Sequence, residues 1–307
     1  MPSSMPSSTQ IAHDFPPFFR VYTDGRVERL VTIPHLPPST DPVTGVQSKD
    51  VVISTKLGIK SRIFLPKINP ANPPQKLPLI IYVHGGAFCL GSPLNVATQS
   101  ILVPLVSQTP AVAIAVGYRL APEHPLPAAY HDCWATLQWI ASHASGAGTD
   151  PWINDYVDTG RVFLVGDSAG ANLAHYLTVQ AGVNRTGLGI RGLMVLHPYF
   201  SEKVPDKMIR YLYPGSSGSD NDPKLNPTSD PDLEKLCSSR VLIAVAENDF
   251  LKPRGVEYNE TLKKSKWKGT IDFVENEDED HCFFLMNPSS EKAKGLSQIL
   301  ISFIKQK

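Results

Sequence analysis

Short apolar runs alternate with longer amphipathic segments through most of this chain. The runs that are apolar at nearly every position lie at 79–83, 111–118, 162–165, 190–196 and 241–246, and a last strand is expected at 271–274. Each run is typical of a strand buried on both faces of a parallel sheet. Segments with helical periodicity lie at about 97–107, 127–142, 168–182, 255–264 and 290–305. Because strands that alternate with helices pair in parallel through right-handed crossovers, we expect an α/β fold with a mostly parallel, twisted central sheet flanked by helices.

The N-terminal part of the chain follows a different pattern. Two antiparallel pairs of strands are expected, from the runs 19–22 with 27–33 and 51–55 with 59–65. Asp24-Gly25, between the first two runs, is a hairpin turn signal. Residues 1 to about 15 are polar and rich in proline and serine, so we expect them to be mobile. The aromatic side chains of Phe15-Pro-Pro-Phe-Phe19 either pack on the body of the protein or line the mouth of a pocket, and the sequence leaves both open.

Length and composition are typical of one globular domain. The 307 residues are 42% apolar and 19% charged, which allows a large buried core. We therefore predict a single domain over residues 1–307, with 1–18 as a largely mobile N-terminus or small cap. Lysine plus arginine and aspartate plus glutamate both number 29. This balance gives no net charge that would favour nucleic acid or an anionic membrane as partner.

Neither targeting nor disulfide chemistry is indicated. The N-terminus lacks the basic and apolar regions of a secretory signal, and no apolar run has transmembrane length, so we expect a cytoplasmic protein. The cysteines at 89, 133, 237 and 282 have no paired spacing. We expect reduced and mostly buried thiols.

The segment Gly166-Asp-Ser-Ala-Gly170 is the first candidate for catalytic chemistry. It follows the apolar run 162–165 and precedes an alanine-rich helical segment, which gives the order strand, turn, helix. In the Gly-x-Ser-x-Gly nucleophile elbow, the serine sits at a strained turn, and small neighbours two residues away make that turn possible. The pattern predicts Ser168 as a nucleophile at the start of a helix.

A serine nucleophile needs a general base, and chain order selects one. After the elbow serine the acid comes next and the histidine last. Of nine histidines, only His175, His197 and His281 follow Ser168. His175 lies two turns into the elbow helix, too far from the hydroxyl, and no strand-end acid precedes His197. His281, in a loop after the last predicted strand, is the remaining candidate.

The acid should follow the preceding strand, where two carboxylates compete. The run 241–246 is followed by Glu247-Asn248-Asp249. Asp249 lies deeper in the loop, so we favour it and keep Glu247 as the alternative. Its task would be to fix the tautomer of the imidazole and to stabilise the imidazolium.

Acyl chemistry also needs donors for the developing oxyanion. His84-Gly85-Gly86 follows the first buried strand, and paired glycines let backbone N–H groups approach a ligand closely. We predict an oxyanion hole formed by the N–H groups of Gly85 and Gly86 together with that of Ala169. Because ligands bind outside the carboxyl ends of parallel strands, these groups should meet Ser168 there.

Other residues beside these motifs are expected to be structural or to line a pocket. We expect His84 to brace its loop and Asp167 to hydrogen-bond neighbouring backbone and so shape the elbow. Phe88, Tyr199 and Phe283 adjoin the predicted site. They are candidates for substrate binding, with core packing as the alternative.

At these residues the sequence resembles a known family. His84-Gly-Gly-Ala-Phe88, Tyr118-Arg-Leu-Ala-Pro-Glu-His-Pro125 and Gly166-Asp-Ser-Ala-Gly-Ala-Asn172 are similar to motifs of the hormone-sensitive-lipase-like group of α/β-hydrolases. Val21-Tyr-Thr-Asp-Gly-Arg-Val-Glu-Arg-Leu30 and Ser265-Lys-Trp-Lys-Gly269 narrow the resemblance to the plant carboxylesterase family. The resemblance implies an α/β-hydrolase fold, the triad Ser168, Asp249 and His281, and oxyanion donors Gly85 and Gly86.

Two departures from the family pattern affect the expected pocket. Ala87 stands where the commoner oxyanion motif has a third glycine, which narrows the pocket slightly. The stretch from about 200 to 228, which in the family covers the substrate pocket, is shorter here, so the resemblance implies a shortened cap insertion. Neither departure touches the triad.

The resemblance implies a serine carboxylesterase that hydrolyses a small to medium carboxylic ester. The same family contains isoflavanone dehydratases, some with threonine at the nucleophile, as well as cyclases and transacylases of specialised metabolism, so non-hydrolytic chemistry is the alternative. It also contains gibberellin receptors, which lack the catalytic histidine that His281 supplies here. No metal-ligand spacing and no phosphate-binding loop after a strand is found, so we expect no metal and no cofactor. The expected partner is a small-molecule ester.

Overall fold

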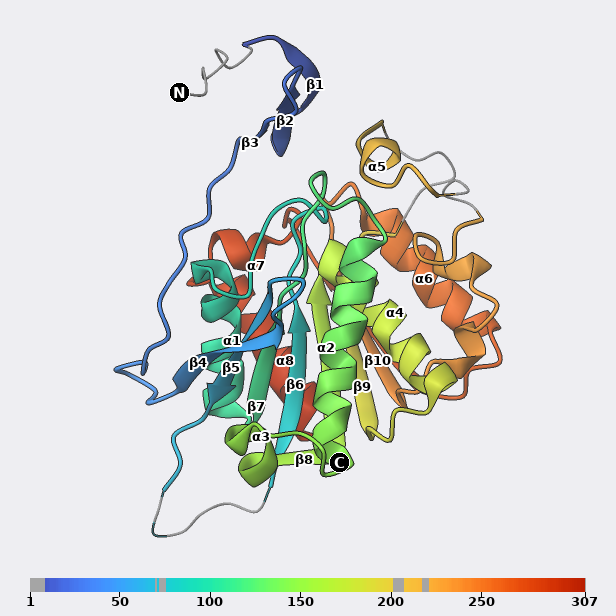
Figure 1. Ribbon diagram of the computed structural model, residues 1–307. Coiled ribbons are helices and arrows are strands. Elements are labelled where there is room, and N and C mark those ends of the chain that lie inside the picture. The colour runs from blue at the N-terminus through green and yellow to red at the C-terminus, as the bar shows by residue number, and fades with distance from the viewer. Residues whose placement is uncertain (1–8, 70, 72–75, 201–206, 217–220, 307) are drawn as a thin grey trace, which may run out of the picture.

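An eight-stranded sheet forms the centre of the molecule (Figure 1). The structure, a computed structural model, describes residues 9–69, 71, 76–200, 207–216 and 221–306. The strands are β4 Gln47–Ser54, β5 Ile59–Leu65, β6 Leu77–Val83, β7 Val112–Val116, β8 Val157–Asp167, β9 Ile190–Leu196, β10 Arg240–Ala246 and β11 Thr270–Asn276. Their spatial order is β4-β5-β7-β6-β8-β9-β10-β11. The strands from β6 to β11 run parallel, and β4 and β5 are antiparallel at one edge.

Helices cover both faces of this sheet, which explains why its central strands are mostly apolar. The helices are α1 Val96–Gln108, α2 Ala128–Ala144, α3 Pro151–Tyr156, α4 Ala169–Asn184, α5 Lys207–Leu212, α6 Lys252–Lys264, α7 Phe283–Met286 and α8 Glu291–Lys305, with 3₁₀ turns at Pro227–Ser229 and Leu233–Lys235. Along β6, Leu79 and Ile81 pack with α2, α4 and α6, whereas Ile80 and Tyr82 pack with α1 and α8. Successive side chains of β6 therefore point to opposite faces of the sheet and pack into two hydrophobic cores, one on each face.

The predicted α/β architecture is confirmed, with differences at its margins. All strands expected between residues 79 and 274 are present, and β8 begins five residues earlier than expected, at Val157. The short helix α3 was not expected, although it carries a start signal. Asp150 accepts the N–H groups of Trp152 and Ile153, and Pro151 occupies the first turn.

A small three-stranded sheet caps the molecule near its N-terminus (Figure 1). Its strands are β1 Ile11–Phe15, β2 Phe19–Tyr22 and β3 Val27–Arg29. We expected a mobile stretch to about residue 15 and 1–18 as a largely mobile N-terminus or small cap. From Ile11 onward the chain forms β1, which pairs with β2 in the cap; residues 1–8 lie outside the described part. The predicted hairpin at Asp24-Gly25 is confirmed.

The cap is held to the body by an apolar cluster and by one arginine. Phe19 is fully buried and packs in one cluster with Leu90, which follows β6, and Leu212 on α5. The aromatic segment thus packs on the body, the first of the two alternatives. Arg29 on β3 donates to both carboxylate oxygens of Glu123, at 2.6 and 2.7 Å. The cap therefore lies over the carboxyl end of the parallel strands.

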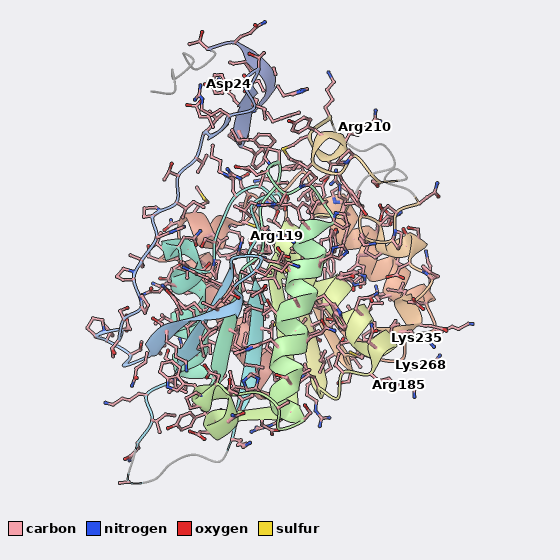
Figure 2. All side chains as sticks on the ribbon, viewed as in Figure 1. Asp24, Arg119, Arg185, Arg210, Lys235 and Lys268 are labelled. Atoms are coloured by element: carbon pink, nitrogen blue, oxygen red, sulfur yellow. The ribbon has the colours of Figure 1, made fainter. Side chains whose placement is uncertain are left out.

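The loop that carries Glu123 is fixed in turn to α2. Arg119, which follows β7 (Figure 2), donates to both carboxylate oxygens of Asp132 at 2.8 Å, and the side chain of Asp132 is completely buried. A bidentate pair of this kind fixes both position and orientation. The loop after β7, on which the cap rests through Glu123, is therefore held firmly to α2.

Three further expectations concern the stretch 200–228, the cysteines and membranes. Of the predicted shortened insertion at about 200–228, residues 201–206 and 217–220 lie outside the described residues, and the remainder includes α5. All cysteines are free thiols, and Cys237 alone among them is exposed. Among the described residues, no helix combines the length and apolarity that crossing a bilayer requires.

Candidate active site

Ser168 stands at the sharp turn between β8 and α4. Its φ of 52° and ψ of −120° lie in a region that costs a non-glycine residue about 1–3 kcal/mol. A Cβ at Gly166 would lie 2.1 Å from the carbonyl oxygen of Gly170, and one at Gly170 would lie 2.1 Å from that of Val83. Only glycine fits at these two positions, as the Gly-x-Ser-x-Gly pattern requires. The turn presents the hydroxyl of Ser168 at the carboxyl end of the sheet.

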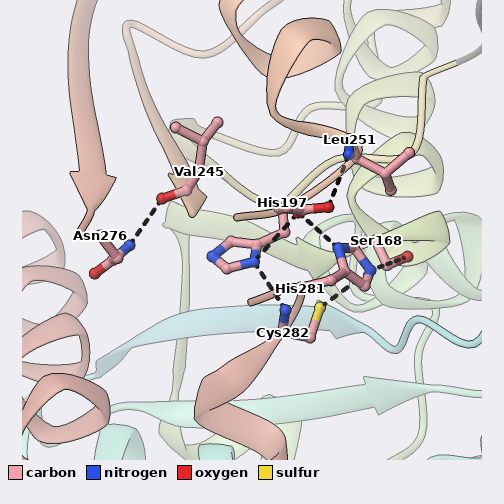
Figure 3. A network of polar contacts seen from close by, with 8 residues as sticks. Ser168, His197, Val245, Leu251, Asn276, His281 and Cys282 are labelled. Atoms are coloured by element: carbon pink, nitrogen blue, oxygen red, sulfur yellow. Dashed lines mark hydrogen bonds and ion pairs between the residues drawn. The ribbon is translucent and has the colours of Figure 1, made fainter. Parts of the chain in front are cut away.

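His281 lies between Ser168 and Asp249, and Figure 3 labels His281 and Ser168. Its Nε2 lies 3.0 Å from the Oγ of Ser168, and its Nδ1 lies 2.7 Å from Oδ2 of Asp249. One tautomer satisfies both contacts, with Nδ1–H donating to Asp249 and Nε2 accepting from the serine hydroxyl. Residues 168, 249 and 281 are thus brought together at the carboxyl ends of the parallel strands. The arrangement fits a nucleophile, a base and an acid that orients the base.

The alternative acid, Glu247, does not take part in this arrangement. It is exposed, and its carboxylate accepts the N–H of Asp278. Asp249 instead has a fully buried side chain, and its Oδ1 accepts the N–H of Leu251 at 2.8 Å. Burial alone raises the pKa of Asp249, but the hydrogen bond and charge of His281 outweigh it, so the pKa lies below its ordinary value. The carboxylate is therefore ionised at neutral pH.

Asp167, next to the nucleophile, determines which glycine amide is available. Its carboxylate accepts the hydroxyl of Tyr82 at 2.5 Å and the N–H of Gly85 at 3.1 Å. The expected backbone contact of Asp167 is therefore present. The prediction of Gly85 as an oxyanion donor is wrong, because its N–H is already taken by this buried carboxylate. Gly85 serves packing instead, since a Cβ there would lie 2.3 Å from Asp167 Oδ2.

The loop after Gly85 offers a different pair of donors. Gly86, Ala87 and Phe88 have successive positive φ values of 105°, 51° and 60°. Within the described part of the chain, the N–H groups of Gly86, Ala87 and Ala169 have no hydrogen-bond acceptor. Backbone turned in this way gathers N–H groups into a concave anion site. These three N–H groups are free to receive a developing negative charge.

The three aromatic candidates for substrate binding are packed in the interior. Phe88 is fully buried, with ring centroids 6.0 Å from Tyr130 and 5.9 Å from Tyr199. Tyr199 is 8% exposed, and its N–H donates to the carbonyl oxygen of Ser168 at 3.0 Å. Phe283 packs 5.8 Å from His197, on the other side of the sheet from Phe88. Their observed contacts are those of core residues.

An aromatic residue that sequence reasoning missed stands beside His281. Phe250 is 71% exposed, and its ring lies 5.9 Å from the His281 ring. The exposed ring therefore lies directly beside an imidazole of the candidate site. Its position directly after Asp249 was the only signal in the sequence.

Two of the other histidines are structural. His84 stacks on Tyr118 with ring centroids 4.3 Å apart, and its Nδ1 lies 2.8 Å from the carbonyl oxygen of Gly85, which confirms it as a loop brace. Burial lowers the pKa of His84 to about 4. His175 is buried in α4, where its Nδ1 lies 2.8 Å from the hydroxyl of Tyr258. Neither reaches the serine.

His197, excluded from the role of base by chain order, is nevertheless part of the site. Its Nδ1 accepts the N–H of Cys282 at 2.9 Å and lies 3.6 Å from Oδ2 of Asp249 (Figure 3). The order of serine, acid and histidine along the chain predicts one histidine beside Asp249, so it does not predict that His197 also lies there. Its signal was its position directly after strand β9.

Among the residues that the structure describes, the fold also brings together one group of side chains that metals can bind. Ligand atoms of His197, His281 and Cys282 lie within 4.8 Å of one another. Two of the ring nitrogens here are engaged, His281 Nε2 with Ser168 and His197 Nδ1 with the N–H of Cys282. A metal ion bound through these two nitrogens would have to displace both hydrogen bonds.

Comparisons with known proteins identify the family of the chain. A family profile described as the alpha/beta hydrolase fold matches residues 80–285. The chain is 41% identical to "Probable carboxylesterase 2" of Arabidopsis thaliana over 97% of each chain, and 38% identical to "2-hydroxyisoflavanone dehydratase" of Glycyrrhiza echinata over 98% of each. A hyperthermophilic esterase from the archaeon Pyrobaculum calidifontis is similar in structure, with a TM-score of 0.68 and 26% identity over 84% of this chain and 85% of that one. The chain therefore belongs to the plant carboxylesterase family of the α/β-hydrolases.

Proposed function

We propose that this protein is a serine carboxylesterase that hydrolyses a small to medium carboxylic ester through an acyl-enzyme on Ser168. One observation carries the proposal: His281 lies within hydrogen-bond distance of both Ser168 Oγ, at 3.0 Å, and Asp249 Oδ2, at 2.7 Å. A nucleophile with its base in reach, and that base oriented by a carboxylate, is the arrangement that nucleophilic acyl transfer requires.

In the first half of the reaction, Ser168 Oγ attacks the ester carbonyl carbon. His281 Nε2 takes the hydroxyl proton as the C–O bond forms, and the carbonyl oxygen becomes an oxyanion. Asp249, ionised and buried, stabilises the imidazolium through Nδ1–H. The imidazolium then gives its proton to the alcohol oxygen as the ester bond breaks, which leaves the acyl group on Ser168.

In the second half, water replaces the alcohol. His281 takes a proton from the water as its oxygen attacks the acyl carbon. It then returns the proton to Ser168 Oγ as that oxygen leaves, so the acid is released and the enzyme is restored. The same imidazole acts as base and acid in both halves.

The proposed oxyanion hole comprises the N–H groups of Gly86, Ala87 and Ala169. The unpaired state of these donors supports the assignment, and the bond from Gly85 to Asp167 removes the fourth amide. Ala169 is the first residue of α4, where the helix dipole adds positive potential. A donor of this kind contributes about 10²–10³-fold to turnover.

Phe250 is better placed to contact a bound ester than the three aromatic residues predicted from the sequence. The rings of Phe88 and Phe283 are enclosed, whereas that of Phe250 is exposed beside His281. His281 delivers the proton to the departing alcohol, so Phe250 lies on the alcohol side of the bond that breaks. Replacement by alanine should raise KM for esters of bulky alcohols more than for methyl esters.

A dehydratase is the second candidate, because one relative named as such matches along nearly its whole length. Elimination of water from a hydroxyl compound needs a base and oxyanion donors but no acyl group on the serine. His281 and the free amides would serve that reaction equally. The two functions therefore differ in whether Ser168 is essential.

Wild type and Ser168→Ala, each incubated with p-nitrophenyl acetate and separately with a fluorophosphonate probe, test the proposal. The esterase requires nitrophenol release and labelling at Ser168 in wild type, with both lost in the variant. Turnover of a hydroxylated substrate by Ser168→Ala at the wild-type rate would favour elimination instead. A wild type that is neither labelled nor active on any ester would contradict the esterase.

The single domain over 1–307 and the cytoplasmic location remain predictions. The contact of the cap with the sequence after β6 supports one cooperative unit. A single transition in thermal unfolding, followed by two spectroscopic probes, would support it, whereas two separate transitions would contradict it.

A further inference from the structure

The carboxylate of Asp249 faces two imidazoles rather than one. His281 Nδ1 lies 2.7 Å from Asp249 Oδ2, and His197 Nδ1 lies 3.6 Å from the same oxygen. The ring centroids of the two histidines are 5.9 Å apart. If both rings carried a proton on Nδ1, both N–H groups would be directed at this one oxygen. The position of the ring proton of His197 therefore determines whether Asp249 Oδ2 accepts a hydrogen bond from His281 alone or from both rings.

The surroundings of His197 hold its Nδ1 as an acceptor. The side chain is completely buried, and its Nδ1 accepts the N–H of Cys282 at 2.9 Å. A nitrogen that accepts a hydrogen bond carries no proton, so the ring proton is on Nε2. Burial is the main cause that lowers the pKa of His197 to about 4, which keeps the ring neutral near pH 7.

The backbone of His197 is fixed where two strands end. Its N–H donates to the carbonyl oxygen of Ala244 on β10 at 2.8 Å, and its φ is 47°. The backbone that carries the ring is thus hydrogen-bonded to a strand of the sheet. On its other side the ring holds Cys282, which has a φ of 53° and directly follows His281. The hydrogen bond therefore runs from the rigid sheet to the residue after the base.

We infer that His197 is a positioning residue: by accepting the Cys282 N–H on Nδ1, it fixes the backbone that carries His281 and reserves the Asp249 carboxylate for His281. The inference rests on the proposed triad. His197 touches neither the serine hydroxyl nor, in the proposed mechanism, the substrate. Its effect passes through the orientation of the His281 ring.

Loss of the acceptor should reduce chemistry more than binding. Without Nδ1 at position 197, the Cys282 N–H has no acceptor and the loop that carries His281 relaxes. A misplacement of about 1 Å in a catalytic group costs on the order of 10²-fold in rate. Because the groups proposed to contact the ester are unchanged, we expect the loss in kcat, with KM within about twofold of wild type.

His197→Asn and His197→Leu form a matched pair for this test. The two side chains branch at the same carbon and have nearly the same shape, but Asn places an acceptor oxygen where Nδ1 stands, and Leu does not. Asparagine also tolerates a positive φ, so Leu carries an additional strain. His197→Ala is therefore the second variant without the acceptor, since Ala87 in this chain adopts a φ of 51°.

The measurements are kcat and KM for p-nitrophenyl acetate below the unfolding temperature of each variant, and the proton NMR signal of the His281–Asp249 hydrogen bond. We expect His197→Asn to retain kcat within about fivefold and to keep the downfield signal. His197→Leu and His197→Ala should lose about 10²-fold in kcat and shift or lose that signal. A folded Leu or Ala variant with wild-type kcat and signal would overturn the inference.

His175→Leu is the control for a merely structural effect. His175 is likewise buried and neutral, and its Nδ1 faces the hydroxyl of Tyr258 instead of the triad. This variant should lower the unfolding temperature and leave the NMR signal in place. Ser168→Ala separates the two proposals: if it stays active, the proposed function fails, whereas if it is inactive and His197→Leu is unimpaired, only the role of His197 fails.

Discussion

Gly170→Ala should disable the site while leaving every proposed catalytic side chain in the sequence. A Cβ at Gly170 would lie 2.1 Å from the carbonyl oxygen of Val83 and 2.5 Å from that of His84. Contacts below 3.0 Å are essentially never seen for a real Cβ, and both atoms are backbone. Either the start of α4 or the end of β6 must therefore move. Both segments lead into the proposed oxyanion hole.

The size of the effect follows from the size of the overlap. The contact to Val83 is more than 1 Å shorter than an ordinary van der Waals distance of at least 3.4 Å. Overpacking of this kind costs about 1–3 kcal/mol of stability. A displacement of about 1 Å between Ser168 and the amides that stabilise the oxyanion reduces the rate by on the order of 10²-fold. We expect both losses together.

The assay compares kcat/KM for p-nitrophenyl acetate and the thermal unfolding temperature of three proteins: wild type, Gly170→Ala and Gly295→Ala. Gly295 lies inside α8, where a Cβ meets nothing within 4 Å. Its replacement should preserve activity and add about 0.5–1 kcal/mol of stability, because alanine favours a helix more than glycine does. Gly170→Ala with wild-type activity and unfolding temperature would refute the close packing on which the account of the elbow depends.

Three further predictions follow from the same contacts. Asp249→Asn should lower kcat by about 10²–10⁴-fold, and Glu247→Gln should stay within about twofold; equal losses in steady-state kinetics would contradict the choice of acid. Phe19→Ala, which empties a fully buried position in the cap cluster, should cost about 3 kcal/mol in chemical denaturation, whereas Ile11→Ala, at a position 43% exposed, should cost under about 1 kcal/mol; similar values would show that the cap is not packed on the body. Burial lowers the pKa of His175 to about 3, so below the unfolded pKa of about 6.5 the unfolded state takes up a proton that the native state refuses. Stability should therefore fall with falling pH, by up to about 1.4 kcal/mol per pH unit from this residue, and the slope between pH 6 and 4 should be smaller in His175→Asn, with an unchanged slope counting against it.

The sequence predicts most of the sheet because its strands are buried on both faces. β6 and β9 are apolar at nearly every position, and the structure covers both of their faces with helices. β1 gives no such signal, since four of its five positions are exposed. It forms because β2 is beside it, and local patterning does not contain that information.

The candidate site likewise has features that the sequence predicts and features that it does not. Chain order and strand ends selected Ser168 and His281 as candidates and narrowed the acid to Asp249 or Glu247, because parallel strands bring such residues to the same end of the sheet. The state of the Gly85 amide was not predictable, since its acceptor is 82 residues away in the sequence. The approach of His197 to Asp249 likewise depends on the register of β9 against β10. Hydrogen bonds between segments that are far apart in the sequence can be identified only from the structure.

The most direct test of the central claim is the trapping of an acyl-enzyme. Wild type mixed with p-nitrophenyl acetate is quenched with acid within the first turnovers, digested, and examined by mass spectrometry for the acetyl group. We expect acetylation of Ser168, in an amount that matches the burst of nitrophenol. Full ester turnover with no acetyl group on Ser168, or with the burst-equivalent acetyl group on another residue, would contradict it.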